Sequence, residues 1–448
     1  MPQTENQEVL EQLSGALASG AFAQIRALLQ ELHPADTAQL LESIPPDQRI
    51  SVWSEVPVEK MGEVLTEVSD GVREGLLEIM DTQMLASAVR SLDVDDIADL
   101  APDLPDDVIA DILFTVDKEE RPAYDAVLSY PEDSAGGLMN IDTTEIRATI
   151  TLATVSRYLR LKGGLPEYTD KLFVVDRDNR LRGILFVSTL LTNDQSLRVA
   201  RFMDNDPIKF TIDTPSTEVA TAFERYNLIS APVVDDDDRL IGRITVDDVI
   251  DVIRESADHA VMVRAGVSEE EDIFAPVYQT ARARALWLGV NLITAVIASW
   301  VIGQFEHTIE KLVAVAVLMP IVASMGGNAG TQTLTIVIRG LAIGTITKSN
   351  AFRVLRKEFL VGGLNGLIWA LAVALVATLW YHDLFLGVII ALAMFINLIA
   401  SAAAGVLLPL ACKRFGIDPA LASGVALTTV TDVIGFLSVL GLAALFLV

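Results

Sequence analysis

The residues whose chemistry stands out lie near the end of the chain, in a long apolar segment. Asp432, in the stretch TTVTDVIGF, lies about midway along it, and no basic residue lies in this or any comparable segment to neutralise it. Thr428, four residues earlier, shares the same face of a helix. A carboxylate at such a depth is costly and by default marks a pathway for ions or protons. A protonated or hydrogen-bonded structural aspartate is the alternative.

A polar stretch interrupts another apolar segment. PIVASMGGNAGTQ (320–332) contains a proline, three glycines, an asparagine, a glutamine and a threonine. Irregular polar backbone at membrane depth is tolerated only where protein buries it or where it lines a watery path. The stretch therefore predicts a break in the helix beside such a path. Asn328, Thr331 and Thr335 are spaced so that they can share a face.

Together these residues offer the ligands of a hard cation. Oxygens of Asn, Thr, backbone carbonyls and one carboxylate suit such an ion. Neither Cys nor His lies near them in the sequence to favour a softer metal. Mg²⁺ sheds water reluctantly and is often held by one or two carboxylates while it keeps several waters. The set therefore favours a hydrated divalent cation such as Mg²⁺.

Five apolar segments must position these residues. They lie at roughly 285–304, 312–338, 359–380, 384–411 and 420–448, and each meets the length of about 20 residues that a bilayer requires. Nine of the ten basic residues after residue 275 would lie on one side of the membrane, and only Lys311 on the other. The positive-inside rule then places the N-terminal half in the cytoplasm and the C-terminus outside.

Charge is divided unevenly along the chain. The 448 residues have a formal charge of −27, but residues 276–448 hold only six acids and ten bases, which leaves −31 in residues 1–275. An acidic surface of this size attracts cations and repels nucleic acid, and it also provides plain solubility. Cys412 is the only cysteine, which excludes an intrachain disulfide and a Cys-rich metal site. The first thirty residues lack the basic and apolar regions of a secretory signal.

Residues 20 to about 130 contain a rough repeat. Acidic helix-start signals recur every eleven or twelve residues between Asp36 and Asp106, with short apolar runs at helical spacing between most of them. Short helices stacked by repetition form a superhelical solenoid. Within this region, LDVDDIADLAPDLPDD concentrates seven acids, among them Asp95 and Asp96.

Two copies of a mixed α/β unit follow this repeat. FVVDRDNRLRGIL matches PVVDDDDRLIGRI, and each copy predicts a strand, a polar turn, a strand and a helix. The copies resemble a tandem pair of CBS modules, which often bind adenine nucleotides. The second copy has the Gly-x-x-Thr-x-x-Asp pattern of these modules at Gly242, Thr245 and Asp248, although an ordinary helix start would also explain it. The first copy has Phe186 and Thr189 at the last two positions and lacks both polar roles.

The helix expected after the second copy is acidic along one face. Asp247, Asp251, Glu255 and Asp258 recur at intervals of four, four and three residues. Like charges at this spacing destabilise an isolated helix by roughly a few tenths of a kcal/mol per pair, and a bound cation would reverse that cost. A solvated acidic face is the alternative. Asp418, in the short loop GIDPA before the last apolar segment, is placed to share such an ion.

The whole chain resembles the MgtE family of magnesium transporters. The stretches EDSAGGLM (132–139), PIVASMGGNAGTQ (320–332) and DPALASG with TDVIG (418–435) occur in the family's order. The resemblance implies a multidomain membrane protein. Its expected parts are an α-helical superhelical N domain (1–130), an α/β tandem CBS pair (131–203 and 204–254), a connecting helix (255–280) and a transmembrane domain with five helices (281–448).

The same resemblance implies a function and its site residues. Members form a homodimer in the bacterial inner membrane, with Mg²⁺ as the substrate and the pore on the two-fold axis. The pore residues would be Asp432, Asn328, Thr331, Thr335, Thr428 and Gly424. Cytosolic Mg²⁺ would close the pore by binding regulatory carboxylates, namely Asp95, Asp96, Asp247, Asp248, Asp251, Glu255, Asp258 and Asp418. ATP is a further regulatory ligand expected at the CBS pair, at Gly242, Thr245 and Asp248.

Some residues depart from the family pattern, and other functions stay open. Val425 stands where many relatives have proline, and Ser256 and His259 interrupt the acidic helix face, so the pore is expected to match the family more closely than the sensor does. A proton-coupled transporter of divalent cations would use Asp432 as its proton carrier. A membrane-anchored nucleotide sensor would leave Asp432 unexplained. No Ser/His/Asp, Cys/His or Walker pattern predicts an enzyme.

Overall fold

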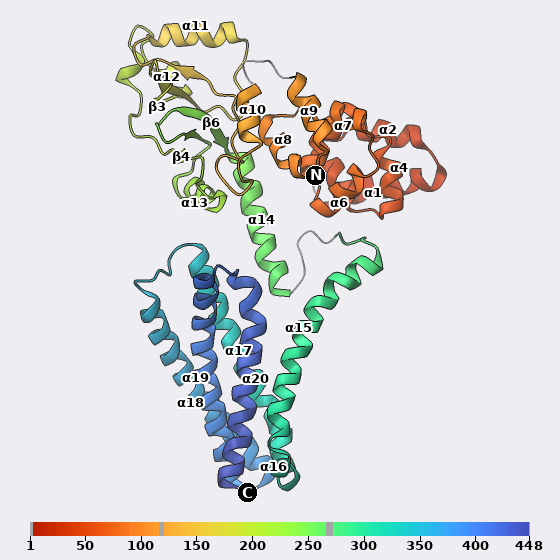
Figure 1. Ribbon diagram of the computed structural model, residues 1–448, viewed down its shortest axis with the longest axis vertical. Coiled ribbons are helices and arrows are strands. Elements are labelled where there is room, and N and C mark those ends of the chain that lie inside the picture. Colours follow the sequence, from red (N-terminus) through yellow and green to blue (C-terminus); the bar gives the residue numbers. More distant parts are fainter. Residues whose placement is uncertain (1–2, 91, 116–120, 266–271, 448) are drawn as a thin grey trace. The chain divides into compact units, whose positions relative to one another are not determined.

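The computed structural model describes residues 3–90, 92–115, 121–265 and 272–447. The chain divides into two compact units. Met1–Asp258 together with Glu270–Ala275 form the first unit, and His259–Glu269 together with Pro276–Val448 form the second. Figure 1 labels most helices and strands of both units.

Short helices make up the N-terminal part of the first unit. From α3 to α9 a new α-helix begins at every twelfth residue, and proline or an acid commonly lies in the first turn, where both are favourable. Helix α3 packs on α5, α5 on α7 and α7 on α9, while α4 packs on α6. This stacking confirms the superhelical arrangement expected from the sequence. The bounds are α1 (Gln3–Ser19), α2 (Phe22–Glu31), α3 (Pro34–Glu42), α4 (Pro46–Trp53), α5 (Val58–Glu67), α6 (Asp70–Leu77), α7 (Thr82–Val89), α8 (Val94–Leu100), η1 (Ala101–Asp103), α9 (Asp106–Thr115) and α10 (Arg121–Val127).

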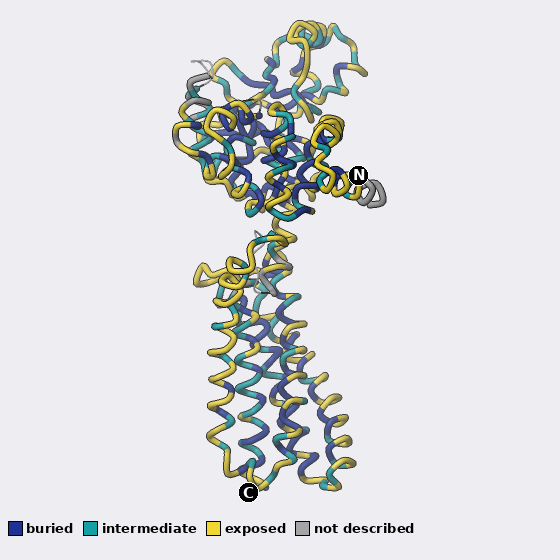
Figure 2. Tube along the Cα trace, turned by 90° about the vertical axis from the view of Figure 1, so that its right-hand side faces the viewer, coloured by how far each residue is buried: buried dark blue, intermediate teal, exposed yellow. Residues whose placement is uncertain are grey.

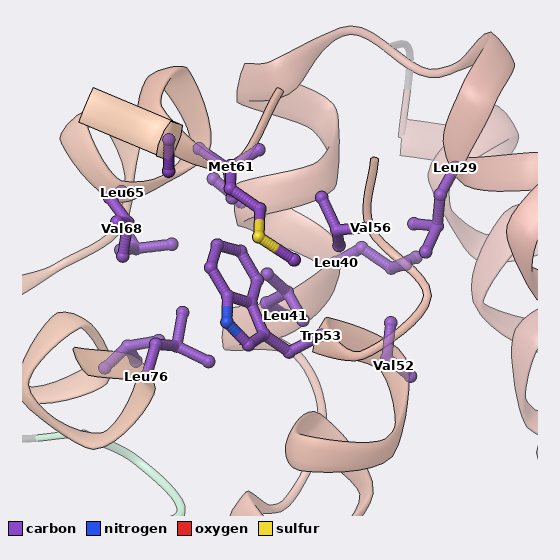
Figure 3. Packing of buried hydrophobic residues seen from close by; sticks show 14 of the residues in the cluster. Leu29, Leu40, Leu41, Val52, Trp53, Val56, Met61, Leu65, Val68 and Leu76 are labelled. Carbon is purple, nitrogen blue, oxygen red and sulfur yellow. The ribbon is translucent and has the colours of Figure 1, made fainter. Parts of the chain in front are cut away.

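A continuous apolar core runs through these helices. Figure 3 shows the Trp53 ring, from α4, surrounded by Leu41, Met61, Leu65 and Leu76, which come from the helices α3, α5 and α6. All five side chains are buried. Each such side chain contributes about 1.5–3 kcal/mol to folding when it leaves water. Because these side chains are buried between helices, the contacts between neighbouring helices stabilise the N domain more than any single helix does.

The two α/β copies have the same sheet topology. In the first, β1 (Glu145–Ile146) runs parallel to β2 (Lys171–Val175), which is antiparallel to β3 (Leu181–Phe186). In the second, β4 (Phe210–Thr211) runs parallel to β5 (Ser230–Val234), which is antiparallel to β6 (Leu240–Thr245). The remaining elements are α11 (Leu152–Lys162), α12 (Val187–Thr192), η2 (Val199–Arg201) and α13 (Ser216–Tyr226).

The hairpin turns of the two copies join them. Asn179 and Asp238 both have a φ of 61°, and each lies at the equivalent position of its turn. The amide N–H of Leu181 donates to Asp238 O at 2.8 Å, and that of Leu240 donates to Asn179 O at 2.9 Å. The internal repeat predicted from the sequence is therefore a structural repeat, and its two copies form a pair.

A single helix, α14 (Val246–Ala265), follows the second copy. It is continuous across residues 254 and 255, where the sequence places the boundary between the CBS module and the connecting helix. Residues 266–271 of the expected connecting segment lie outside the described residues.

The second unit is a bundle of long helices. Among the described residues, five helices are long and apolar enough to cross a membrane, as the sequence predicts. They are α15 (Val277–Gly303), α17 (Val313–Ala342), α18 (Ala351–Tyr381), α19 (Leu384–Phe415) and α20 (Pro419–Phe446), with the short α16 (Glu306–Lys311) between the first two. Helix α19 packs against α17, α18 and α20. The outward faces of the bundle are exposed along much of their length (Figure 2).

The predicted break in the second membrane helix is wrong. Helix α17 runs from Val313 to Ala342 without interruption and contains Pro320 within it. Two of its glycines serve close packing: a Cβ on Gly326 would collide with Asn397, and one on Gly330 would lie 2.9 Å from a Leu427 methyl. These two glycines therefore reflect contacts between helices and not irregular backbone.

Candidate cation sites

The predicted pore residues lie on one face of two neighbouring helices. Helices α17 and α20 pack together, and their backbones approach closely where Gly330 meets Leu427. Of the residues on α17, Asn328 and Thr331 are exposed and Thr335 is half-buried; of those on α20, Gly424 and Thr428 are exposed and Asp432 is half-buried. The bundle formed by one chain thus leaves these groups uncovered.

Asp432 lies among neutral groups. Within the described part of the chain, no hydrogen bond or ion pair joins its carboxylate to another residue. The Thr428 hydroxyl, one turn earlier, donates to Gly424 O at 3.2 Å, and the Thr431 hydroxyl donates to Thr428 O at 3.0 Å. Because each hydroxyl donates its hydrogen bond to a backbone carbonyl of the helix, its oxygen lone pairs remain available as acceptors. This face offers oxygen ligands and one carboxylate per chain.

An acidic cavity of about 310 Å³ lies in the first unit, and residues at the start of α8 and from both CBS modules line it. Its lining includes Asp93, Asp95, Asp142, Glu167 and Asp247. Asn140 Nδ2 donates to Asp93 Oδ2 at 3.1 Å and to Asp95 Oδ1 at 3.2 Å. The buried Oδ1 of Asp247 has no hydrogen-bond partner among the described residues. The cavity thus concentrates negative charge, and at least one of its carboxylate oxygens, Asp247 Oδ1, could still accept a hydrogen bond or bind a cation.

The pKa values of the surrounding carboxyl groups reflect this crowding. Burial, and then the Asp93 carboxylate, raise the pKa of Asp95 to about 6. Burial and the Asp95 carboxylate raise the pKa of Asp96 to about 7. The pKa of Asp248 is also raised, by burial and by the charges of Asp95 and Asp247. Both desolvation and like charge disfavour the ionised form, so these carboxyl groups bind protons at a higher pH than an ordinary aspartate does, and a bound cation would oppose that binding.

The nucleotide motif is built into the same region. The Thr245 hydroxyl donates to Asp248 Oδ2 at 2.9 Å, so these two side chains engage each other. A Cβ on Gly242 would lie 2.8 Å from Asn140 O, so this glycine permits a close backbone approach. Thr245 and Arg243 line the acidic cavity. Sequence reasoning did not identify Asn140 or Arg243, and nothing in their spacing marks them.

The remaining predicted regulatory carboxylates are more exposed. Asp251, Glu255 and Asp258 all lie on exposed positions of α14. Asp418 begins α20, where its Oδ1 accepts from Ala420 N at 2.8 Å. Its Oδ2 lies 3.1 Å from His259 Nε2, and both residues belong to the second unit. Within the described residues, no group of three or more His, Cys, Asp or Glu side chains is arranged to hold a metal ion by itself. A Mg²⁺ ion that keeps several waters needs only one or two carboxylates.

Comparison with known proteins matches each part of the chain. Residues 319–442 match the MgtE family, described as a divalent cation transporter; residues 32–133 match the MgtE intracellular N domain, and residues 199–255 match the CBS domain. The magnesium transporter MgtE of Thermus thermophilus is 31% identical over 97% of this chain and 98% of its own length. The magnesium transporter MgtE of Bacillus subtilis is 28% identical over 96% of both.

A solved structure is similar to part of the chain. The cytosolic domain of the Mg²⁺ channel MgtE in complex with ATP is 32% identical and aligns over 54% of this chain and 99% of its own length, with a TM-score of 0.49. The alignment with the Thermus thermophilus relative includes the helical N domain, the CBS pair and the five apolar helices of this chain and covers nearly the entire length of both proteins. The chain therefore belongs to the MgtE family of magnesium transporters, which are membrane proteins and not enzymes.

Proposed function

We propose that the chain is a Mg²⁺-selective channel that works as a homodimer, with the pore between two copies of the α17–α20 face. The observation that carries this proposal is the exposure of Asn328, Thr331 and Thr428 on that face. Polar groups facing lipid are costly, because hydrocarbon offers them no hydrogen bonds. A second copy set against the same face would cover them and enclose a polar path.

Such a path would hold two carboxylates, one Asp432 from each copy, and no basic side chain. Two carboxylates and a ring of hydroxyl and amide oxygens suit a Mg²⁺ ion that retains much of its water. The half-buried position of Asp432 leaves its carboxylate accessible from the proposed axis. In this arrangement the conducted ion is neutralised by fixed charge while its inner water shell stays largely intact.

The acidic cavity of the first unit is the proposed sensor. We place the first unit in the cytoplasm, the C-terminus outside, and the protein in the bacterial inner membrane. Cytosolic Mg²⁺ would bind where Asp95 and Asp247 line the cavity and where the buried Asp247 Oδ1 lacks a partner among the described residues. Because a ligand shifts an equilibrium only through its preference for one state, Mg²⁺ must bind the closed arrangement more tightly. The exposed acids of α14 and Asp418 would contribute to the same closure.

A nucleotide at this cavity would need a cation. The relative's cytosolic domain was solved with ATP, and Thr245 and Asp248 of this chain carry the corresponding pattern. Five carboxylates line the cavity here, and they would repel a triphosphate. We propose that ATP binds this chain as its Mg²⁺ complex. Titration calorimetry should show ATP binding in Mg²⁺ that is lost in EDTA; equal affinity in both would refute the proposal.

Uptake into proteoliposomes tests the function as a whole. The protein is reconstituted, vesicles with the first unit inside are selected, and entry of Mg²⁺ is followed with a trapped fluorescent indicator. Uptake should be rapid when the lumen starts free of Mg²⁺ and should fall when millimolar Mg²⁺ is present inside. A proton-coupled transporter, in which Asp432 carries the proton, makes a different prediction: its uptake would change when an imposed proton gradient is reversed, whereas channel flux would not.

A further inference from the structure

Helix α19 has two polar residues at the centre of the membrane unit. Asn397 and Ser401 lie one turn apart, and both are fully buried. Asn397 Nδ2 donates to the backbone carbonyl of Val322 on α17 at 2.8 Å. Asn397 Oδ1 and Ser401 Oγ have no hydrogen-bond partner among the described residues. A buried polar pair in an otherwise apolar helix is costly, and polar residues within membrane segments commonly mark functional positions.

The amide of Asn397 occupies space that two glycines leave open. A Cβ added to Gly326 of α17 would overlap Asn397 Nδ2 and would lie 2.8 Å from Asn397 Cγ and 3.0 Å from Ser401 Oγ. A Cβ added to Gly435 of α20 would lie 3.0 Å from Asn397 Nδ2. One amide therefore fills a gap bounded by both helices that bear the proposed pore residues.

The neighbouring glycine of α17 behaves differently. A Cβ added to Gly327 would meet nothing closer than Thr431 Oγ1, at 3.9 Å, which is an ordinary contact. Gly326 and Gly327 thus differ in their surroundings although they are adjacent in the sequence. The tight fit is a property of the Asn397 site and not of the glycine-rich stretch in general.

We propose that Asn397 is a positioning residue for conduction. Its hydrogen bond to Val322 O holds α17, and its amide volume sets how closely α17 and α20 approach at Gly326 and Gly435. Gly326 precedes Asn328 by two residues, and Gly435 follows Asp432 by three, so the spacing of the pore face is set at this level. The inference rests on the proposed pore and deepens it, because it names the residue that fixes the relative position of the two pore helices.

The test is a coupling experiment on full-length protein in proteoliposomes. Gly326→Ala should reduce Mg²⁺ uptake by about tenfold, because overpacking a filled site forces the helices apart, whereas the matched control Gly327→Ala should leave uptake within about twofold of wild type. Asn397→Ala should also reduce uptake, because the hydrogen bond and the filled volume are both lost. The double variant Asn397→Ala with Gly326→Ala should transport several-fold better than Gly326→Ala alone, since the new methyl enters the vacated space.

Two further readouts separate positioning from folding. Asn397→Leu keeps roughly the side-chain volume and cannot donate to Val322 O, and it should lower the ratio of Mg²⁺ to Ca²⁺ uptake while size-exclusion elution and thermal melting stay like wild type. Equal effects of Gly326→Ala and Gly327→Ala would overturn the proposal. The proposal would also be overturned if the uptake losses of the two single variants simply multiplied in the double variant, or if the Mg²⁺ to Ca²⁺ ratio were unchanged in Asn397→Leu.

Failure of the pore itself gives a different pattern. If Asp432→Ala conducted normally while Gly326 and Asn397 still showed coupling, the proposed location of the pore would be wrong and the helix contact would stand. If Asp432→Ala lost all uptake but the coupling was absent, the pore would stand and the positioning role of Asn397 would be rejected.

Discussion

Asp432 in the membrane unit and Asp95 in the first unit both lack a basic partner among the described residues, but their surroundings are opposite. Asp432 stands alone, half-buried on a face of neutral oxygens. Asp95 is buried and crowded by other carboxylates, and the Asn140 amide donates to its side chain at 3.2 Å. The single charge can act as a fixed ligand, whereas the crowded charges form a group whose net charge must be lowered by protons or cations before it is stable.

In the proposed function, conduction and regulation use different kinds of site. A conducted ion must be able to leave, which favours few ligands and retained water. A sensed ion must change an equilibrium, which favours many charges that repel one another until the ion binds. Substitutions at Asp432 test the proposed conduction site, and substitutions of acids in the first unit test the proposed regulatory site.

The largest effect is expected at Asp432. Asp432→Ala should abolish Mg²⁺ uptake, and Asp432→Asn should also fail, because an oxygen without charge cannot offset a divalent ion. Asp383→Asn is the matched control: this acid of the membrane unit caps α19 by accepting from Phe385 N at 2.8 Å, and asparagine can keep that cap. Tracer uptake into proteoliposomes measures all three. Normal uptake by a folded Asp432→Ala protein would remove Asp432 from the pore.

Loss of closure is expected next, when the acids of α14 are neutralised. Replacing Asp248, Asp251, Glu255 and Asp258 together by their amides should leave the channel open at high internal Mg²⁺. Basal uptake without internal Mg²⁺ should be unchanged. The control removes the same number of exposed acids elsewhere in the first unit, at Glu11, Glu31, Glu218 and Glu224. Closure that persists in the first variant, or that is lost equally in the control, would show that the α14 face is only a solvated surface.

A third prediction concerns an acid of the first unit that does have a basic partner. Arg49 on α4 is buried, and its Nη1 lies 2.8 Å from Asp272 Oδ2, just before the first membrane helix. Arg49→Met should destabilise the first unit by about 3–5 kcal/mol, because a buried carboxylate loses its counter-ion. The exposed pair of Arg26 with Glu55 is the control, and Arg26→Met should cost at most about 1 kcal/mol. Hydrogen exchange of α3 to α6 in the full-length protein measures both; equal changes in exchange would contradict the prediction.

The smallest effect is a pH dependence of the first unit. Because the pKa values of Asp95, Asp96 and Asp99 are raised to about 6, 7 and 8, the folded unit binds more protons than the unfolded chain above pH ~4. Its stability should therefore fall as pH rises through this range when Mg²⁺ is absent. Millimolar Mg²⁺ should reduce that fall, because it takes the place of the protons.

Asp95→Asn sharpens the pH prediction. At pH 8 without Mg²⁺ it should stabilise the first unit on the order of 1–2 kcal/mol, since it removes one buried charge and keeps an oxygen for Asn140. Thermal unfolding of the full-length protein at pH 5 and pH 8, with EDTA or Mg²⁺, gives the four values needed. A melting temperature that does not depend on pH in EDTA would show that repulsion among Asp95, Asp96 and Asp99 does not destabilise the first unit.

The architecture of this protein follows from sequence patterns that act over short distances. Five apolar stretches of sufficient length predict five membrane helices, and helix-start signals that recur about every eleven or twelve residues predict the stacked N domain. Two matching strand-turn-strand stretches predict the paired modules. Such features depend on the period and length of hydrophobic runs, which a single sequence displays directly.

Only the tertiary structure decided which distant residues share a site. The glycines of the 320–332 stretch suggested broken backbone, yet Gly326 makes room for Asn397, 71 residues later, inside a continuous helix. The contacts of Asn140 with Asp93 and Asp95, and of Arg49 with Asp272, likewise join residues far apart in the chain. No periodicity marks such pairs, because they depend on how whole helices and modules pack against one another, and packing brings together side chains whose sequence separation is arbitrary.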